Sequence, residues 1–426
     1  MMTSDVRSLL TGLFEHAVEY VMPEHCLGPK LCCDAPEGRL LVLGAGKAAA
    51  SMAEVVSNHY GGQVEGLVVT RYGHGAERDI PSIEVIEAAH PVPDEMSQQA
   101  ARRMLDMAAE LSPEDRLVFL ASGGGSAVLS LACDGLPFED KRALVKHLVL
   151  SGAPIQDINA VRKHVSAIKG GRLAAAAGDA EVVTYVISDV PGDNPADVAS
   201  GPTVADRSTL ADARRVIETY GAPDIATLSA ILSDEGRETP KSLSSKTKTL
   251  VVAKASDALD AVRRRAGELG YEVHYLGDDV EGNARDLGSE HASRALRFKE
   301  EGRKALILSG GEATVEVKSR EGRGGPNMEY VLGVALAIQG HSDISVLACD
   351  SDGIDGSEDA AGGFADGMTV TRAQAEGLDV SALLNENKSY DVLKALGDLI
   401  VTGPTRTNVN DIRMIVVEGD QNDQSE

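Results

Sequence analysis

The sequence predicts an α/β protein with two domains, each built on a mainly parallel sheet that helices cover. Short runs rich in Val, Leu and Ile recur along the chain, and segments with helical periodicity separate most of them, which is typical of alternating strands and helices. The chain has 426 residues, of which 43% are hydrophobic, enough for more than one core. The polar stretch 233–249 has almost no apolar residue and marks a boundary. We therefore expect a Rossmann-like N-terminal domain over residues 1–240 and a second α/β domain over 241–426.

The first expected element is an amphipathic helix over residues 3–21, because its apolar residues recur at spacings of three and four. This segment reads as a docking helix and not as a signal peptide. The expected strands then follow in order at 40–45, 66–71, 116–122, 182–189, 249–254, 304–311, 344–350, 398–403 and 414–417. Two short echoes, LASGGGSAV with LSGGEATV and SGPT with TGPT, indicate two similar halves whose strand ends face one crevice.

Composition limits the classes of partner. The net charge of −25 would repel a nucleic-acid backbone. No segment offers about 18 consecutive apolar residues, so no membrane span is expected. The five cysteines form no C-x-x-C pair, which favours a reducing cytoplasm. In such an acidic chain a local cluster of Lys and Arg becomes informative, because an anionic ligand could bind only where that cluster overrides the general field.

A glycine turn follows the first expected strand. Gly44, Gly46 and Ala49 fit the pattern G-x-G-x-x-A, which places backbone N–H groups and a helix N-terminus against an anion. A dinucleotide site would also need an acidic residue after the second strand, but that strand ends at Arg71. Lys47 opposes the helix dipole unless it has an anionic partner. We interpret the turn as a phosphate site; the alternative is a tight turn with Lys47 in solvent.

A second turn, ASGGGSAV, contains more glycines than a turn needs and favours anion binding. The alternatives are a structural turn or a nucleophilic Ser126 with His90 or His164 as its base. The segment 158–176 then gathers Arg162, Lys163, Lys169 and Arg172. If one helix is continuous there, Arg162, Ser166, Lys169 and Arg172 share a face, although Gly170 and Gly171 could interrupt it. An anion site and a solvated basic face both explain these residues.

Acidic residues follow two expected strands. Asp189 and Asp193 come after one strand, and Asp350, Asp352 and Asp355 come after another. Carboxylates at strand ends can accept a hydroxyl proton or hold Mg²⁺, while capping and turn formation are the structural alternative. A third glycine turn at 309–315 leads into a hairpin-like TVEVK, and Arg323 precedes a helix expected to begin at Pro326. The strand end 401–412 adds hydroxyl and amide groups. Together these strand ends suit a cleft for a polyphosphate and a small acid.

The ordered motifs resemble the glycerate 2-kinases of the MOFRL type over nearly the whole chain. They are GAGKAAASMA, HPVPDE, SGGGSA, NAVRKHVSAIKGGRLA, SDVPGD, SGPT, SGGEATV, GRGG followed by NxE, SDGIDG and TGPTRTNVND. The resemblance implies phosphorylation of D-glycerate by ATP with Mg²⁺, usually to 2-phosphoglycerate, in a cleft between two α/β domains. Rival functions are an NAD(P)H-dependent hydroxypyruvate reductase, a label that family members have also carried, and a non-catalytic metabolite-binding protein.

The resemblance also implies roles for residues. Lys47 and Arg162 would neutralise the substrate or the transferring phosphate, Asp189 would act as base or metal contact with Asp193 beside it, and Arg323 would be catalytic. Pro326 stands where the family often has arginine, so Arg323 is expected to take on more of the cationic role. A homodimer is the expected assembly. The remaining expected binding residues are Gly44, Gly46, Ser122, Gly123, Gly124, Gly125, Ser126, Lys169, Gly310, Gly311, Glu312, Asn327, Asp352, Thr405 and Asn408.

Overall fold

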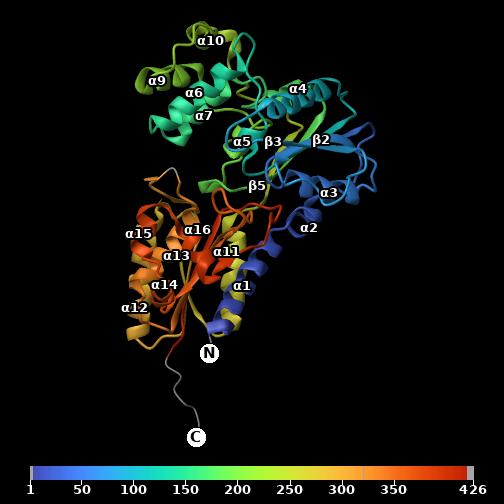
Figure 1. The fold of residues 1–426 in the computed structure, drawn as a ribbon. Coiled ribbons are helices and arrows are strands. Elements are labelled where there is room, and N and C mark those ends of the chain that lie inside the picture. Colours follow the sequence, from blue (N-terminus) through green and yellow to red (C-terminus); the bar gives the residue numbers. More distant parts are fainter. Residues whose placement is uncertain (1–2, 320, 420–426) are drawn as a thin grey trace. The chain divides into compact units, whose positions relative to one another are not determined.

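The computed structural model describes residues 3–319 and 321–419 and divides into two compact units (Figure 1). The N-terminal unit is Pro23–Ala253, and the C-terminal unit joins the residues up to Met22 to those from Lys254 onward. These units differ from the expected domains 1–240 and 241–426 at both ends. Strand β6 (Thr247–Ala253) pairs with β5 (Glu181–Ile187) and so belongs to the first sheet. Helix α1 (Thr3–Tyr20) packs against α11 (Ala255–Glu268) and β11 (Ile344–Asp350) of the second unit.

The N-terminal unit contains a six-stranded sheet in the order β3-β2-β1-β4-β5-β6, and every pairing in it is parallel. The expected parallel sheet is confirmed here. Sequence periodicity missed β3, in which exposed and partly exposed residues interrupt the buried ones. Its remaining strands are β1 (Leu40–Ala45), β2 (Glu65–Arg71), β3 (Ile83–Ala88) and β4 (Arg116–Ala121).

The strand order creates a switch point. From β1 the chain adds β2 and then β3 on one side, and it returns to place β4, β5 and β6 on the other. The connections that leave β1 and β4 therefore run in opposite directions. In open α/β sheets this arrangement leaves a crevice at the carboxyl ends of the two central strands, where ligands bind. The turns after β1 and β4 are the two glycine turns of the sequence.

Helices complete the N-terminal unit. Helices α6 and α7 pack with α9 and α10 around their own core of Leu144, Leu148, Val161 and Val216, and these four helices gather into a lobe apart from β2 and β3 (Figure 1). The helices and 3₁₀ turns of this unit are α2 (Pro23–Cys26), η1 (Gly28–Lys30), α3 (Ala49–His59), α4 (Glu95–Ala109), α5 (Gly125–Val128), α6 (Phe138–Leu150), α7 (Ile155–His164), α8 (Arg172–Ala176), η2 (Pro191–Asp193), η3 (Val198–Ser200), α9 (Leu210–Tyr220), α10 (Leu228–Ser233) and η4 (Glu235–Arg237).

The C-terminal unit contains a mixed six-stranded sheet in the order β13-β12-β11-β14-β9-β7. Only β7 and β9 pair in parallel, so the expectation of a mainly parallel sheet is wrong for this unit. The short link 351–361 returns β12 antiparallel beside β11, because a parallel return would need a longer crossover. Its other strands are β7 (Glu272–Gly277), β9 (Ala305–Ser309), β12 (Gly362–Asp366), β13 (Leu399–Ile400) and β14 (Asp411–Val417).

Two local predictions in this unit have different outcomes. Helix α13 (Pro326–Ala337) begins at Pro326 as predicted, with Gly325 as its N-cap. The TVEVK hairpin does not form; instead β10 (Ala313–Thr314) pairs in parallel with β8 (Gly282–Asn283). The remaining helices are α12 (Ala284–Glu300), α14 (Thr369–Ala375), α15 (Val380–Asn385) and α16 (Ser389–Leu396). Across residues 3–319 and 321–419, no helix has the length and apolarity that a bilayer crossing requires.

Candidate functional site

The turns after β1 and β4 are interlocked at the switch point. Ser122 donates its N–H to the Ala45 carbonyl (3.1 Å), and Lys47 donates its N–H to the Gly123 carbonyl (2.8 Å). The buried Ser122 hydroxyl accepts the Ala48 N–H (3.0 Å). Gly46 has a φ of +127°, and a Cβ there would lie 2.3 Å from the Ser122 Oγ. Gly46 and Ser122 therefore fix the path of the turn that carries Lys47.

Lys47 shares this edge with His90, which the sequence proposed only as one of two alternative bases for a nucleophilic Ser126. Gly124 has a φ of +77°, and a Cβ there would lie 3.2 Å from His90 Cδ2 and 3.4 Å from Lys47 Cγ. The loops after β1, β3 and β4 therefore converge on one glycine. The signal for His90 was the motif HPVPDE, which follows the strand that periodicity missed. Lys47, His90 and Gly124 are all half-buried.

Ser126 is the first of a series of hydrogen-bonded polar side chains that extends from the glycine turn to Arg162. Its hydroxyl bonds the Ser200 hydroxyl (2.7 Å), and Ser200 also contacts Asn159 Oδ1 (3.5 Å). Arg162 donates from Nη1 to the same amide oxygen (3.3 Å). Ala199 and Ser200 hold left-handed φ values of +53° and +58°, a strained conformation for residues with side chains, and such residues cluster at functional sites.

The structure disfavours the nucleophilic-serine alternative with His164 as its base. The buried His164 ring contacts the Ala160 carbonyl through Nδ1 (2.7 Å) and Glu238 through Nε2 (2.7 Å). Glu238 lies in the polar stretch expected to be a linker, and this contact ties that stretch to the helical lobe. Both nitrogens of His164 are therefore engaged away from Ser126.

Lys169 is buried and does not present its ammonium to solvent. It donates to the carbonyls of Ser126 (3.1 Å) and Ala199 (3.2 Å), and so joins the glycine turn to the strained segment. Of the two possibilities that the sequence left open, the interrupted helix is found: α7 ends at His164, and positive φ at Gly170 and Gly171 turns the chain before α8. The residues Arg162, Ser166, Lys169 and Arg172 therefore share no helical face.

Asp189 and Asp193 lie in the loop after β5, next to β4 in the sheet. Both are half-buried, and Asp193 has a φ of +52° at the end of η2. Carboxylate oxygens are ligands that suit Mg²⁺, which is commonly bound through one or two carboxylates together with substrate phosphates. Among the residues that the structure describes, no three His, Cys, Asp or Glu side chains group as metal ligands.

In the C-terminal unit, several predicted residues meet at one edge of the mixed sheet. Gly311 accepts the Asp411 N–H at its carbonyl (3.3 Å), and Asp352 accepts the Thr405 N–H at its carbonyl (3.0 Å). The Asp352 carboxylate accepts the Ile354 N–H (2.7 Å), a turn contact. A Cβ on Gly311 would lie 2.3 Å from the Val280 nitrogen, so only glycine fits there. Near this edge Gly310 and Asn408 are buried, whereas Glu312 is exposed.

Asn327 joins two buried carboxylates behind this edge. Its Nδ2 donates to Asp411 (2.7 Å) and to Asp355 (3.3 Å), while Asp355 also accepts the N–H groups of Asn327 (3.1 Å) and Met328 (2.8 Å). Burial and, to a smaller extent, the negative Asp411 raise the pKa of Asp355 to about 7, against the opposing effect of the N–H donors. Asp411 in turn pairs with the buried Arg413 (3.1 Å). Asn327 therefore occupies a charged network at the N-terminus of α13.

Arg323 is exposed and already bound to carboxylates. Its guanidinium pairs with Glu358 (2.7 Å) and Asp391 (3.0 Å) and lies 4.5 Å from the centre of the Tyr390 ring. The hydrogen bond with Glu358 raises the pKa of Arg323. A catalytic role for Arg323 would require it to leave or share these partners, and that role stays a prediction.

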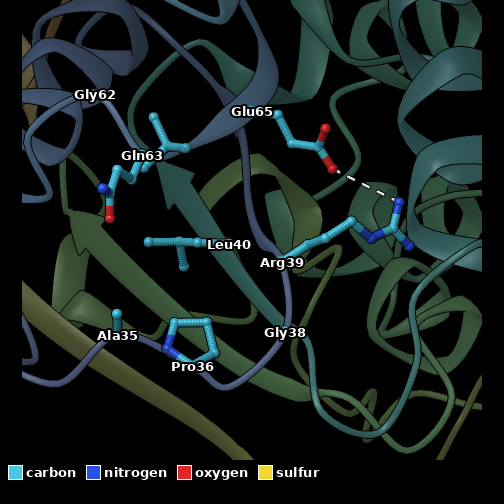
Figure 2. Close-up of a pocket in the computed structure, with 9 residues that line it drawn as sticks. Ala35, Pro36, Gly38, Arg39, Leu40, Gly62, Gln63 and Glu65 are labelled. Atoms are coloured by element: carbon cyan, nitrogen blue, oxygen red, sulfur yellow. Dashed lines mark ion pairs between the residues drawn. The ribbon is translucent and has the colours of Figure 1, made fainter.

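A hollow of about 360 Å³ lies elsewhere in the N-terminal unit (Figure 2). It lies at the amino ends of β1 and β2, where Arg39 pairs with Glu65 (3.6 Å). The Lys47 turn follows the carboxyl end of β1, at the opposite edge of the same sheet. The hollow contains none of the residues predicted for binding or catalysis. The interlocked turns are therefore the stronger candidate site.

Comparison with known proteins identifies two family models that match the chain. The model of a domain of unknown function, DUF4147, matches residues 9–233, and the MOFRL family model matches residues 305–411. A D-glycerate 2-kinase from Thermotoga maritima is 38% identical over 96% of this chain and 97% of its own. A crystal structure of a glycerate kinase from the same organism aligns with a TM-score of 0.87 at 36% identity, covering 97% of this chain and 100% of that one. A relative from Agrobacterium vitis, provisionally named hydroxypyruvate reductase, is 46% identical over 96% of this chain and 94% of its own.

Proposed function

The chain belongs to the protein family that combines a DUF4147 domain with a MOFRL domain, and on this premise we propose that it is a glycerate 2-kinase. It would transfer the γ-phosphoryl group of ATP to the 2-hydroxyl of D-glycerate. One observation carries the proposal: Lys47 stands in the switch-point turn beside α3, where the backbone of two glycine turns is locked in place. Phosphoryl transfer depends mainly on such positioning and on charge stabilisation.

The expected chemistry follows from the groups at this edge. The hydroxyl oxygen of glycerate attacks the γ-phosphorus while the bond from that phosphorus to the ADP oxygen breaks, and the hydroxyl proton moves to a base. Lys47 would neutralise charge on the transferring phosphoryl group, and the backbone beside Gly124 would approach its oxygens. Asp189 is a candidate for the base, because β5 delivers it beside the glycine turn after β4.

Mg²⁺ fits the donor set of the same loop. When bound, it would neutralise charge on the nucleotide phosphates. Asp189 and Asp193 are the carboxylates that would hold it together with phosphate oxygens. Whether Asp189 acts as base or as metal contact can be decided by the Mg²⁺ dependence of its amide variant.

Hydroxypyruvate reduction is the competing function, because some relatives carry that name. The end of β2 argues against an NADH site, which places an acidic residue there to hold the ribose, whereas β2 ends at Arg71. Because an arginine there is compatible with the 2′-phosphate of NADPH, the test includes both cofactors. The deciding experiment measures ADP formation from ATP with and without D-glycerate, with the position of the product phosphate read by phosphorus NMR. A parallel assay follows NADH and NADPH with hydroxypyruvate. Robust hydride transfer without glycerate-dependent ADP would refute the kinase.

Two properties of the whole molecule belong to the same proposal. A cytoplasmic location is supported by the five cysteines, all of which have free thiols, as a reducing compartment would keep them. A homodimer is proposed for the assembly, and light scattering of the purified chain would measure its mass.

A further inference from the structure

Two lysines of the N-terminal unit are buried behind the glycine turn after β4. Lys169 is 1% exposed and Lys141 is 3% exposed. Lys169 donates to the Ser126 carbonyl (3.1 Å), and Lys141 donates to the Leu131 carbonyl (2.8 Å) and the Ser130 hydroxyl (3.2 Å). Both ammonium groups therefore end on the segment 126–131, which continues directly from the turn.

No carboxylate balances this charge. Within residues 3–319 and 321–419, Lys141, Lys169 and Arg162 form no ion pair, although neighbouring Lys163 pairs with Asp206 (3.2 Å). Burial lowers the pKa of Lys141 to about 7 and also lowers that of Arg162. Burial and the neighbouring cations lower the pKa of Lys169 well below its usual value. Burying unpaired charge is costly, and this chain carries 66 Asp and Glu residues against 41 Lys and Arg. The surroundings of these three cations therefore lack a paired carboxylate, although the chain as a whole has an excess of acidic residues.

Arg162 is more accessible to solvent than the buried Lys141 and Lys169. It is half-buried, and Asn159 Oδ1 accepts a hydrogen bond from its Nη1 (3.3 Å). Asn159 also binds an acidic residue: its Nδ2 donates to Asp197 Oδ1 (3.3 Å), while Asn194 donates to Asp197 Oδ2 (2.7 Å). The Asp197 carboxylate thus accepts hydrogen bonds from two amides and does not pair with the guanidinium.

Two serine hydroxyls connect Asn159, which binds Arg162, to the glycine turn after β4. Asn159 Oδ1 accepts from Ser200 (3.5 Å), and the Ser200 hydroxyl bonds that of Ser126 (2.7 Å). Lys169 fixes both backbones, since it bonds the carbonyls of Ser126 and Ala199. A guanidinium fork beside two fixed hydroxyls is an arrangement that binds a planar carboxylate through two hydrogen bonds.

We propose that Arg162 and Ser126, the latter held by the buried Ser200 hydroxyl, form the subsite for the carboxylate of a small hydroxy acid, which would also stabilise the ammonium forms of Lys141 and Lys169 behind it. The inference rests on the proposed kinase function and assigns different roles to Lys47 and Arg162 at the switch point. Lys47 serves the phosphoryl group, and Arg162 serves the carboxylate of the acceptor. Positive charge within the fold would favour an anionic acceptor over a neutral one of the same size.

The test compares D-glycerate with D-glyceramide, which replaces the carboxylate by a neutral amide of similar shape. Binding of each ligand is measured by calorimetry for the wild type, Arg162→Met and Arg162→Lys, with steady-state kinetics alongside. Arg142→Met is the matched control, because Arg142 lies in the same helical lobe and pairs at the surface with Glu139 (2.7 Å). Thermal melts establish that each variant is folded.

We expect Arg162→Met to weaken glycerate binding by about 10- to 100-fold, as loss of charge-assisted hydrogen bonds does. Glyceramide binding should change by less than about threefold, because a neutral amide forms no charge-assisted pair with Arg162, and the KM for ATP should change by less than about twofold, because ATP does not use the subsite. Arg162→Lys should fall between the wild type and Arg162→Met, because it keeps the charge and loses the fork, and Arg142→Met should match the wild type.

Equal losses for glycerate and glyceramide would overturn the subsite, and so would a raised KM for ATP with unchanged glycerate binding, which would assign Arg162 to the nucleotide. A different result would refute the proposed kinase function without deciding the subsite. If the wild type binds glycerate and forms no ADP, the kinase assignment is wrong, while the binding comparison still decides the subsite. If the wild type binds neither ligand, both proposals fall.

Discussion

Replacement of Gly46 by alanine should distort the turn that carries Lys47, and the structure indicates how strongly. A Cβ at this position would lie 2.3 Å from the Ser122 hydroxyl and 2.4 Å from the Ser122 carbonyl oxygen. The φ of +127° is itself unfavourable for alanine, at about 1–3 kcal/mol, and overpacking typically adds about 1–3 kcal/mol. We therefore expect Gly46→Ala to lower the free energy of unfolding by about 2–6 kcal/mol.

Thermal melts, which give Tm, and the kinase assay, which gives kcat/KM, test this prediction. At about 2–4 °C per kcal/mol for a domain of this size, Tm should fall by about 4 °C or more. The value of kcat/KM should also fall, because the turns separate. Gly178→Ala is the matched control: its φ is +59° and nothing lies within 4 Å of the added Cβ, so only strain of about 1–2 kcal/mol is expected. If both variants lose the same stability, the close approach of Gly46 to Ser122 does not constrain the site, and our account of the interlocked turns is wrong.

Four further predictions concern individual side chains. Lys47→Met should fold normally and turn over at least about tenfold more slowly, about 1.4 kcal/mol of transition-state stabilisation; near-normal kinetics would return Lys47 to a solvent role. Asp189→Asn should slow turnover similarly, and an altered Mg²⁺ dependence would identify a metal contact, whereas an unchanged rate would remove it from the mechanism. Arg323→Ala should lower kcat/KM while Pro326→Arg is tolerated, because Pro326 only begins α13; a folded Arg323→Ala with normal kinetics would leave Arg323 to its pairs with Glu358 and Asp391. Because the pKa of Asp355 is raised to about 7, its neutral form stabilises the fold, so this contribution is full below about pH 4 and is lost as pH rises through about 7. Chemical denaturation from pH 4 to 8 should therefore show wild type losing stability relative to Asp355→Asn, and a constant difference would contradict the raised pKa.

The sequence predicted local structure well where a segment's burial appears in its own pattern. The runs at 40–45 and 344–350 became β1 and β11, and the helix start at Pro326 is where α13 begins. Strand β3 was missed because exposed and partly exposed residues interrupt its buried ones. The directions of the strands in the second sheet were also missed, because an apolar run reads the same in either direction and pairing depends on the path of the connecting loops.

By itself the sequence determined that both glycine turns follow strands, that Lys47 stands in one of them, and that β2 ends without the acid of a dinucleotide site. Only the tertiary structure decided what these residues contact. Lys169 looked like a ligand group in a basic run, yet it binds carbonyls at Ser126 and Ala199, and His90 lies against Gly124. Periodicity and spacing report which residues are buried within one element, because burial repeats with the turn of the helix or the pleat of the strand. Contacts between residues that are far apart in the chain depend instead on the order in which strands join the sheet, and no local pattern encodes that order.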